Sequence, residues 1–266
     1  MTWGRLRRSR PDVLASPRRA RQRVTLSEEN GVRYLHFGTE WIQGGMRIAR
    51  PWQLELEYQR QMMALALFLP RPARILQLGL GAAALTKFCY RHLPDTCITA
   101  VELSAEVIEV AHRSFALPLD DDRLVVAEAD ARDYLGTLRR GEQADWLQVD
   151  LYDAAARGPV HDDTAFYRLC RRALRRPGVA CFNLFGGRFD PSFRAIAAAF
   201  DDRVLTGPTV DEGNRIVYAF SGPRFDESSV TLARRATRLE KAWHMPVTQW
   251  LAELKRANEL PDRIRI

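Results

Sequence analysis

From Ala73 onward, the sequence alternates short apolar runs with amphipathic stretches of about ten residues, and this alternation limits the folds open to the chain. Apolar runs of this length are typical of parallel strands buried on both faces, and the stretches between them have the helical period. The pattern predicts an α/β fold with a doubly wound parallel sheet, because each helix must cross back over the sheet. Strands are expected at 73–80, 97–103, 123–129, 144–152, 178–185, 203–207 and 215–222, and helices at 83–93, 104–115, 131–140, 163–174 and 191–200.

A smaller β-rich unit is predicted ahead of this sheet. Residues 24–38 form two alternating runs around Asn30-Gly31, a dipeptide that accepts the positive φ angles of a tight hairpin turn. A further strand pair is expected within 40–49, followed by one helix over 54–70. The predicted organisation is an arm (1–23), a β-rich unit (24–53) and a large domain (54–266) that ends in amphipathic helices at 228–242 and 246–258.

The formal net charge of +7 is concentrated in the N-terminal arm. Residues 1–23 contain eight arginines and one acid, so the rest of the chain, with 32 basic and 32 acidic residues, is neutral. Such an arm can contact phosphate or anionic lipid, but a disordered, solvated tail is the simpler interpretation. The charge therefore does not favour nucleic acid as a partner of the folded body.

Other sequence features argue against membrane and metal chemistry. No apolar run approaches the roughly 20 residues that cross a bilayer, and the arginine-rich N-terminus has no apolar signal core. The four cysteines form no C-x-x-C pair, which is typical of reduced thiols, and the five histidines show no ligand spacing. We expect a cytoplasmic protein without a membrane partner or a bound metal.

The ends of the first three predicted strands indicate a nucleoside site. Gly79 and Gly81 allow a sharp turn at which a ligand can approach main-chain N–H groups. Glu102 closes the second strand, where a ribose diol would be held, and Asp130 closes the third, where it could accept a hydrogen bond from an adenine amino group. The alternatives are a small-residue turn with a surface glutamate, or a dinucleotide site.

Two acids follow the fourth predicted strand. Asp150 and Asp153 lie three residues apart at the carboxyl edge, where open parallel sheets bind ligands. An alkylamine with a pKa near ~10 must lose a proton before it attacks carbon, and a carboxylate can accept that proton. The alternative is that the two acids cap the following loop or pair with Arg157.

These motifs together resemble the polyamine aminopropyltransferases, of which spermidine synthase is the best known. The resemblance extends to Gln43, in a G-x-x-Q-like turn, and to Tyr58, in a Y-x-E-M-like helix with Met62 and Met63. It implies a class I S-adenosylmethionine-dependent methyltransferase-like (Rossmann-like) fold and a homodimer formed through the N-terminal unit. It also implies that decarboxylated S-adenosylmethionine is the co-substrate and a small amine is the acceptor.

The resemblance also implies roles for individual residues. Gln43, Gly79 and Gly81 would bind the donor, Glu102 its ribose, and Asp130 with Ala131 its adenine. Asp150 would contact the aminopropyl region and Asp153 would be the base. The acceptor would lie against Tyr58, Gln61 and Tyr152.

The chain departs from the family pattern where the donor amine and the acceptor should bind. Ala82 stands where the glycine loop normally carries an acid, Gln61 is identified with the glutamate of the helix motif, and Ala154 replaces a proline. Each change removes negative charge or alters shape. Two alternatives therefore stay open: a methyltransferase that uses intact S-adenosylmethionine, and a catalytically silent nucleoside-binding homologue.

Overall fold

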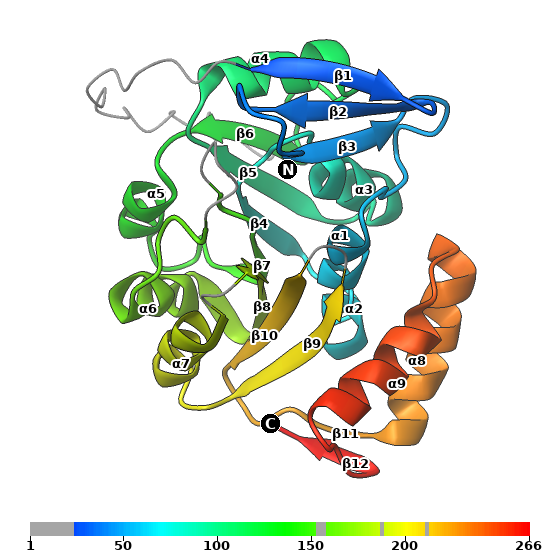
Figure 1. Cartoon of the computed structure of the whole chain (residues 1–266). Helices are drawn as coiled ribbons and strands as arrows, with labels where there is room; N and C mark the ends of the chain where they lie inside the picture. The colour runs from blue at the N-terminus through cyan, green and yellow to red at the C-terminus, as the bar shows by residue number, and fades with distance from the viewer. Residues whose placement is uncertain (1–23, 153–157, 187–188, 211–212) are drawn as a thin grey trace, which may run out of the picture.

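The structure is a computed structural model that describes residues 24–152, 158–186, 189–210 and 213–266 (Figure 1). The predicted arm (1–23) and Asp153 lie outside these residues. A seven-stranded sheet in the order β6-β5-β4-β7-β8-β10-β9 forms the centre of the molecule. Its strands are β4 (Arg74–Leu78), β5 (Cys97–Glu102), β6 (Leu124–Glu128), β7 (Ala144–Val149), β8 (Leu174–Phe185), β9 (Val204–Val210) and β10 (Asn214–Ser221).

The strand order confirms the doubly wound α/β fold. Strands β4 to β8 pair in parallel, and β10 pairs antiparallel with both β8 and β9. The chain starts in the middle at β4, builds outward to β6, and then returns to β7 on the other side of β4. The reversal between β4 and β7 creates the crevice at which sheets of this kind bind ligands.

Helices cover both faces of the sheet. Residues from α5 (Ala131–Thr137), α6 (Thr164–Arg172) and α7 (Phe189–Ala199) share one apolar cluster, on the left in Figure 1. Residues from α3 (Ala84–His92) and α4 (Ala105–Ser114) belong to the clusters of the opposite face. Side chains of β4 pack on both faces of the sheet: Ile75 belongs to one apolar cluster, and Leu76 and Leu78 belong to the other. This two-sided burial explains why the strands read as continuous apolar runs.

The N-terminal unit is a three-stranded antiparallel sheet of β1 (Thr25–Glu29), β2 (Val32–His36) and β3 (Gly44–Arg47). Asn30 and Gly31 have φ angles of 51° and 75°, as the predicted hairpin turn requires. The strand pair expected within 40–49 is instead the single strand β3. Its backbone packs against the glycine loop, because a Cβ at Gly44 would lie 2.8 Å from the Cβ of Ala82.

The helix predicted over 54–70 is divided into α1 (Glu57–Met62) and α2 (Leu65–Phe68). At the division, Met63 N bonds Arg60 O at 3.0 Å and Ala64 N bonds Gln61 O at 2.8 Å, which is the tighter 3₁₀ pattern. The hydroxyl of Tyr218, far away in the sequence, also donates to Gln61 O at 2.8 Å. This tertiary hydrogen bond stabilises a break that local periodicity does not reveal.

The C-terminal segment contains the two predicted helices, α8 (Ser229–Trp243) and α9 (Val247–Ala257), which pack against each other as a hairpin beside α2 and β9 (Figure 1). A short antiparallel ribbon of β11 (Asp226–Ser228) and β12 (Arg263–Arg265) flanks them and was not predicted, since each strand has only three residues. None of the helices in the described ranges is long and apolar enough to cross a membrane.

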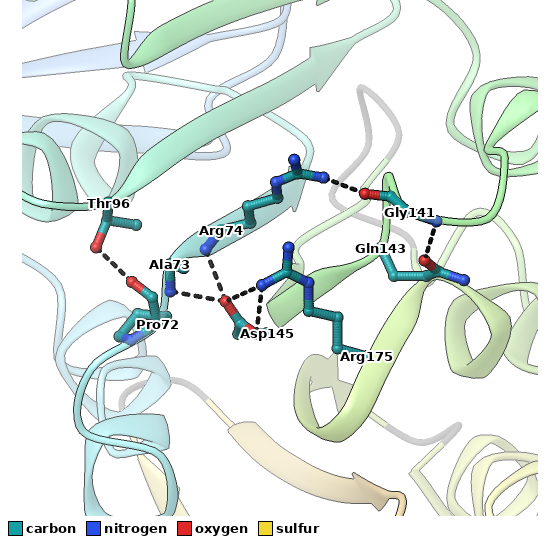
Figure 2. A network of polar contacts seen from close by, with 8 residues as sticks. All are labelled: Pro72, Ala73, Arg74, Thr96, Gly141, Gln143, Asp145 and Arg175. Carbon is teal, nitrogen blue, oxygen red and sulfur yellow. Dashed lines mark hydrogen bonds and ion pairs between the residues drawn. The ribbon is translucent and has the colours of Figure 1, made fainter.

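A polar network fixes the amino edge of the two central strands (Figure 2). Asp145, at the start of β7, accepts hydrogen bonds from the backbone amides of Ala73 at 2.7 Å and Arg74 at 2.8 Å, and pairs with Arg175 at 3.3 Å. The guanidinium of Arg74 in turn donates to the carbonyl of Gly141. Because both strands are anchored here, their carboxyl ends reach the opposite edge in a defined register.

Candidate active site

A cavity of about 370 Å³ opens at the carboxyl edge of the central sheet. Its walls come from the loop between β2 and β3, from α1, and from the ends of β4, β5, β6, β7, β8 and β10. The structure brings together here most of the residues singled out from the sequence: Gln43, Tyr58, Gly79, Gly81, Glu102, Asp130, Ala131, Asp150 and Tyr152.

The glycine loop requires its glycines. Gly79 and Gly81 have φ angles of 93° and 51°, in the region that L side chains rarely adopt. A Cβ at Gly79 would lie 2.2 Å from the carbonyl oxygen of Asp150, so a side chain here would push β4 and β7 apart. The loop therefore places open backbone at the point where the strand order reverses.

Glu102 ties the glycine loop to the end of β5. Its Oε2 accepts a hydrogen bond from Leu80 N at 3.0 Å, and its Oε1 accepts one from Ser104 N at 3.0 Å. Burial raises the pKa of Glu102, and the backbone hydrogen bonds from Ser104 and Leu80 oppose that rise. The carboxylate is thus held in a fixed orientation at the cavity wall.

Asp130 combines a helix-capping role with a place in the cavity. Its Oδ1 accepts hydrogen bonds from the backbone amides of Arg132 at 2.8 Å and Asp133 at 3.2 Å, which caps α5. Its Oδ2 lies 3.5 Å from Nε2 of His161, a cavity residue that was not predicted from the sequence to belong to the site. Ala131 is buried as the first residue of α5.

Asp150 is held by a chain of side chains that crosses three strands and α1. Its Oδ1 accepts from Nδ2 of Asn183 at 2.9 Å, and its Oδ2 accepts from the hydroxyl of Tyr58 at 3.3 Å. The Nδ2 of Asn214 donates to Oδ1 of Asn183 at 3.0 Å, which fixes the amide so that its nitrogen faces the acid. Burial raises the pKa of Asp150, and the hydrogen bonds from Asn183 and Tyr58 counteract this.

The aromatic neighbours of Asp150 remain protonated. Burial, and then the charge of Asp150, raise the pKa of Tyr58 well above its ordinary value. Burial and Asp150 also raise the pKa of Tyr152, whose hydroxyl donates to the carbonyl of Asn183 at 2.8 Å. Both side chains therefore donate hydrogen bonds through their hydroxyls and line the cavity with their rings.

Sequence reasoning missed Gln59, which lines the cavity and has a buried acceptor without a partner among the described residues. Gln59 is 5% exposed, and its Nε2 donates to the hydroxyl of Tyr58 at 3.3 Å. Its Oε1 is buried and has no hydrogen-bond partner among the described residues. Such an oxygen can accept a hydrogen bond from an ammonium or amine group that enters the cavity. The position of Gln59 directly after Tyr58 was the sequence feature that could have indicated its place in the site.

Gln61 occupies a different place from the one expected. It is 2% exposed and is not among the described residues that line the cavity, and its Oε1 lies near Gly207 on β9. Two residues along a helix turn the side chain by about 200°, so Gln59 and Gln61 point in nearly opposite directions.

Within the described ranges, no group of three or more histidine, cysteine, aspartate or glutamate residues could hold a metal ion.

Comparisons with known proteins find relatives that match most of the chain. No family model matches the chain. The polyamine aminopropyltransferase of Chromobacterium violaceum is 33% identical over 255 residues, which cover 95% of each chain. The polyamine aminopropyltransferase of Neisseria meningitidis serogroup A is 32% identical over 238 residues, which cover 88% of this chain and 90% of that one.

Two solved structures share the fold. Human methyltransferase-like protein 13 in complex with SAH superposes with a TM-score of 0.63 at 27% identity, covering 71% of this chain and 93% of that one. The spermidine synthase of Thermotoga maritima superposes with a TM-score of 0.60 at 19% identity, covering 90% of this chain and 85% of that one. The second likeness shows the fold alone. It extends over more of the chain than the first.

Proposed function

Because the chain belongs to the polyamine aminopropyltransferases, we propose that this transferase moves an aminopropyl group from decarboxylated S-adenosylmethionine to a small amine. The observation that carries the proposal is the pairing of two half-sites in one cavity. The glycine loop and Glu102 form a nucleoside half, and Asp150, Tyr58 and Gln59 form an acidic, hydrogen-bonding half.

We assign the donor to the first half-site. Its ribose would be held by Glu102, whose carboxylate is already oriented by Leu80 N and Ser104 N. Its adenine would lie against Asp130 and Ala131 at the start of α5, and its sulfonium end beside Gly79 and Gly81. Gln43 lies close to this loop, since a Cβ at Gly81 would be 3.2 Å from Gln43 O.

We assign the acceptor to the second half-site. An alkylammonium would be attracted to Asp150 and could donate to Oε1 of Gln59, with Tyr58 and Tyr152 as walls. After Asp153, outside the described residues, accepts a proton from the ammonium, the nitrogen lone pair attacks the carbon attached to sulfur. A C–N bond forms, the C–S bond breaks, and neutral methylthioadenosine leaves. The two half-sites contribute by proximity, and a base adds ~10²–10⁴-fold.

Methyl transfer from intact S-adenosylmethionine is the second candidate. Ala82 favours it, because no acid of the glycine loop would repel the carboxylate of that donor. Ala82 is 2% exposed and packs against Gly44, so the loop and β3 are closed together at this position. The two candidates differ in the nucleoside product, which is methylthioadenosine for aminopropyl transfer and S-adenosylhomocysteine for methyl transfer.

Turnover of Asp153→Asn tests the proposed chemistry. With decarboxylated S-adenosylmethionine and a panel of diamines, we expect kcat to fall by about 10²-fold or more while the donor Kd stays unchanged. The matched control is Asp133→Asn, which removes an acid on α5 outside the cavity and should leave kcat unchanged. Equal activity of Asp153→Asn and the wild type would contradict the role of the base. Donor binding without turnover of the wild type would favour a silent homologue.

We also propose a homodimer formed through the N-terminal unit (24–53), which works beside the large domain (54–266). The unit exposes the apolar side chains of Leu26, Trp41, Ile42 and Ile48, which a second copy could cover. Light scattering of the wild type and of Leu26→Ser tests the dimer.

A cytoplasmic location is proposed because the four cysteines are free and three of them are buried.

A further inference from the structure

A second cavity, of about 450 Å³, lies where the C-terminal helical hairpin meets α3 and the segment before α1. Its walls are residues 49–54, Arg60 on α1, the last turn of α3, and the connection between α8 and α9. None of these residues lines the cavity at the carboxyl edge. The helix α3 starts at the glycine loop and ends at this second cavity, so the two cavities lie at opposite ends of one helix.

Basic side chains converge on this cavity from four separate segments, and the described residues that line it include no aspartate or glutamate. The basic residues are Arg50, Arg60, Arg91, His92 and His244. Of these five, Arg60 alone forms an ion pair with another described residue, Glu57 at 3.3 Å, and it also donates to the carbonyl of Leu54 at 2.9 Å. The cavity is thus a concentration of positive charge on a folded body that is neutral as a whole.

Aromatic rings line the same space. The guanidinium carbon of Arg91 lies 5.6 Å from the centre of the Trp52 ring, which holds that side chain over an apolar surface. Trp243 and Phe88, which meet edge to face with ring centres 5.4 Å apart, close another wall. A cavity of this kind offers charged donors together with flat apolar surface.

We propose that this second cavity binds a small polyanion that carries linked phosphate groups. Guanidinium groups present paired donors that match phosphate oxygens, and those of Arg50, Arg60 and Arg91 come from three different segments. Arg91, His92 and His244 lie at the ends of α3 and α8, where positive charge also suits the helix dipoles. Arg60 likewise lies in the last turn of α1, whereas Arg50 lies before α1 and has no such explanation.

The crowding of positive charge predicts how binding depends on pH. Burial, and then the charges of Arg91 and His244, lower the pKa of His92. Arg50 and Arg60, which are also positive, line the same cavity. A bound phosphate group would oppose this repulsion, so binding should raise the pKa of His92 and should tighten as pH falls.

Isothermal titration of the full-length protein with tripolyphosphate and with UTP tests the proposal. The pocket variant is Arg50→Gln/Arg91→Gln, and the control is Arg234→Gln/Arg238→Gln, which removes the same charge from exposed positions on α8. We expect the pocket variant to bind at least about tenfold more weakly than the wild type, and the control to bind within about twofold of it. NMR titration of the His92 ring should show a higher pKa with the ligand bound.

The two ligands distinguish the source of the phosphate chemistry. Equal affinities would identify a site for phosphate groups alone, and tighter binding of UTP would add a ring that stacks in the apolar part of the cavity. Absence of binding by both ligands would overturn the proposal. So would an equal loss in the pocket and control variants, because that result would reflect general electrostatic attraction, including attraction to the arginine-rich N-terminal segment.

Discussion

A buried lysine beneath the N-terminal sheet gives a sharp test of how α3 is packed. Lys87 on α3 is 1% exposed, and its Nζ donates to the carbonyl of Phe115 at 2.6 Å. Burial lowers the pKa of Lys87 from its ordinary value of 10.5 to about 7. Below pH 10.5 the unfolded chain binds this proton, whereas the folded chain binds it only below about pH 7. The free energy of unfolding should therefore rise with pH across this window.

The substitution Lys87→Met removes this titration. At 1.36 kcal/mol for each pH unit, the stability of the wild type should gain up to about 4 kcal/mol relative to Lys87→Met between pH 7 and pH 10. The substitution also leaves the Phe115 carbonyl without its donor, which costs about 1–3 kcal/mol at both pH values. The pH-dependent difference, rather than the absolute stability, therefore reports the buried amine.

Urea unfolding followed by tryptophan fluorescence at pH 7 and pH 10 measures the difference. The matched control is Lys241→Met on the exposed surface of α8, for which the difference from the wild type should be the same at both pH values. Comparing variants cancels the titration of every other group. A difference between Lys87→Met and the wild type that does not change with pH would refute the reasoning.

Three further substitutions test the site and the frame that positions it. Asn183→Leu removes a hydrogen bond that lowers the pKa of Asp150, so the acidic limb of the pH profile of kcat/KM should move to higher pH; an unmoved limb would contradict this. Gly79→Ala places a Cβ 2.2 Å from the Asp150 carbonyl, and should weaken donor binding at least tenfold or prevent folding, as calorimetry and circular dichroism would show. Asp145→Asn weakens the anchor of the Ala73 and Arg74 amides at the start of β4 and should lower the free energy of unfolding by about 1.5–3 kcal/mol in urea, whereas a loss below about 0.5 kcal/mol would argue against the anchor.

The sequence predicted the central sheet well because burial on two faces leaves a direct signal in the chain. The strands β4 to β7 lie within the ranges expected from their apolar runs, and the ends of those strands place Gly79, Glu102, Asp130 and Asp150 at one cavity. A parallel sheet brings the carboxyl ends of its strands to one edge, so position along each strand was sufficient to predict this grouping.

Features that depend on distant parts of the chain were not predictable in the same way. The break between α1 and α2 is stabilised by the Tyr218 hydroxyl on Gln61 O, and β3 replaces a strand pair because Gly44 packs on Ala82. Asn183 and Asn214 meet only because β10 runs antiparallel to β8, which places Asn214 opposite Phe185 in the register. Gln59 and Gln61 lie on opposite sides of α1 because two residues turn a helix by about 200°. Gln59 therefore lines the cavity, where Gln61 was expected.

The most direct test of the central claim is to identify the nucleoside that the protein releases. Purified protein would be given decarboxylated and intact S-adenosylmethionine in equal amounts, together with a mixture of diamines, and the products would be identified by mass spectrometry. Aminopropyl transfer predicts methylthioadenosine and an acceptor whose mass has increased by one aminopropyl group. Release of S-adenosylhomocysteine with a methylated acceptor, and no methylthioadenosine, would contradict it.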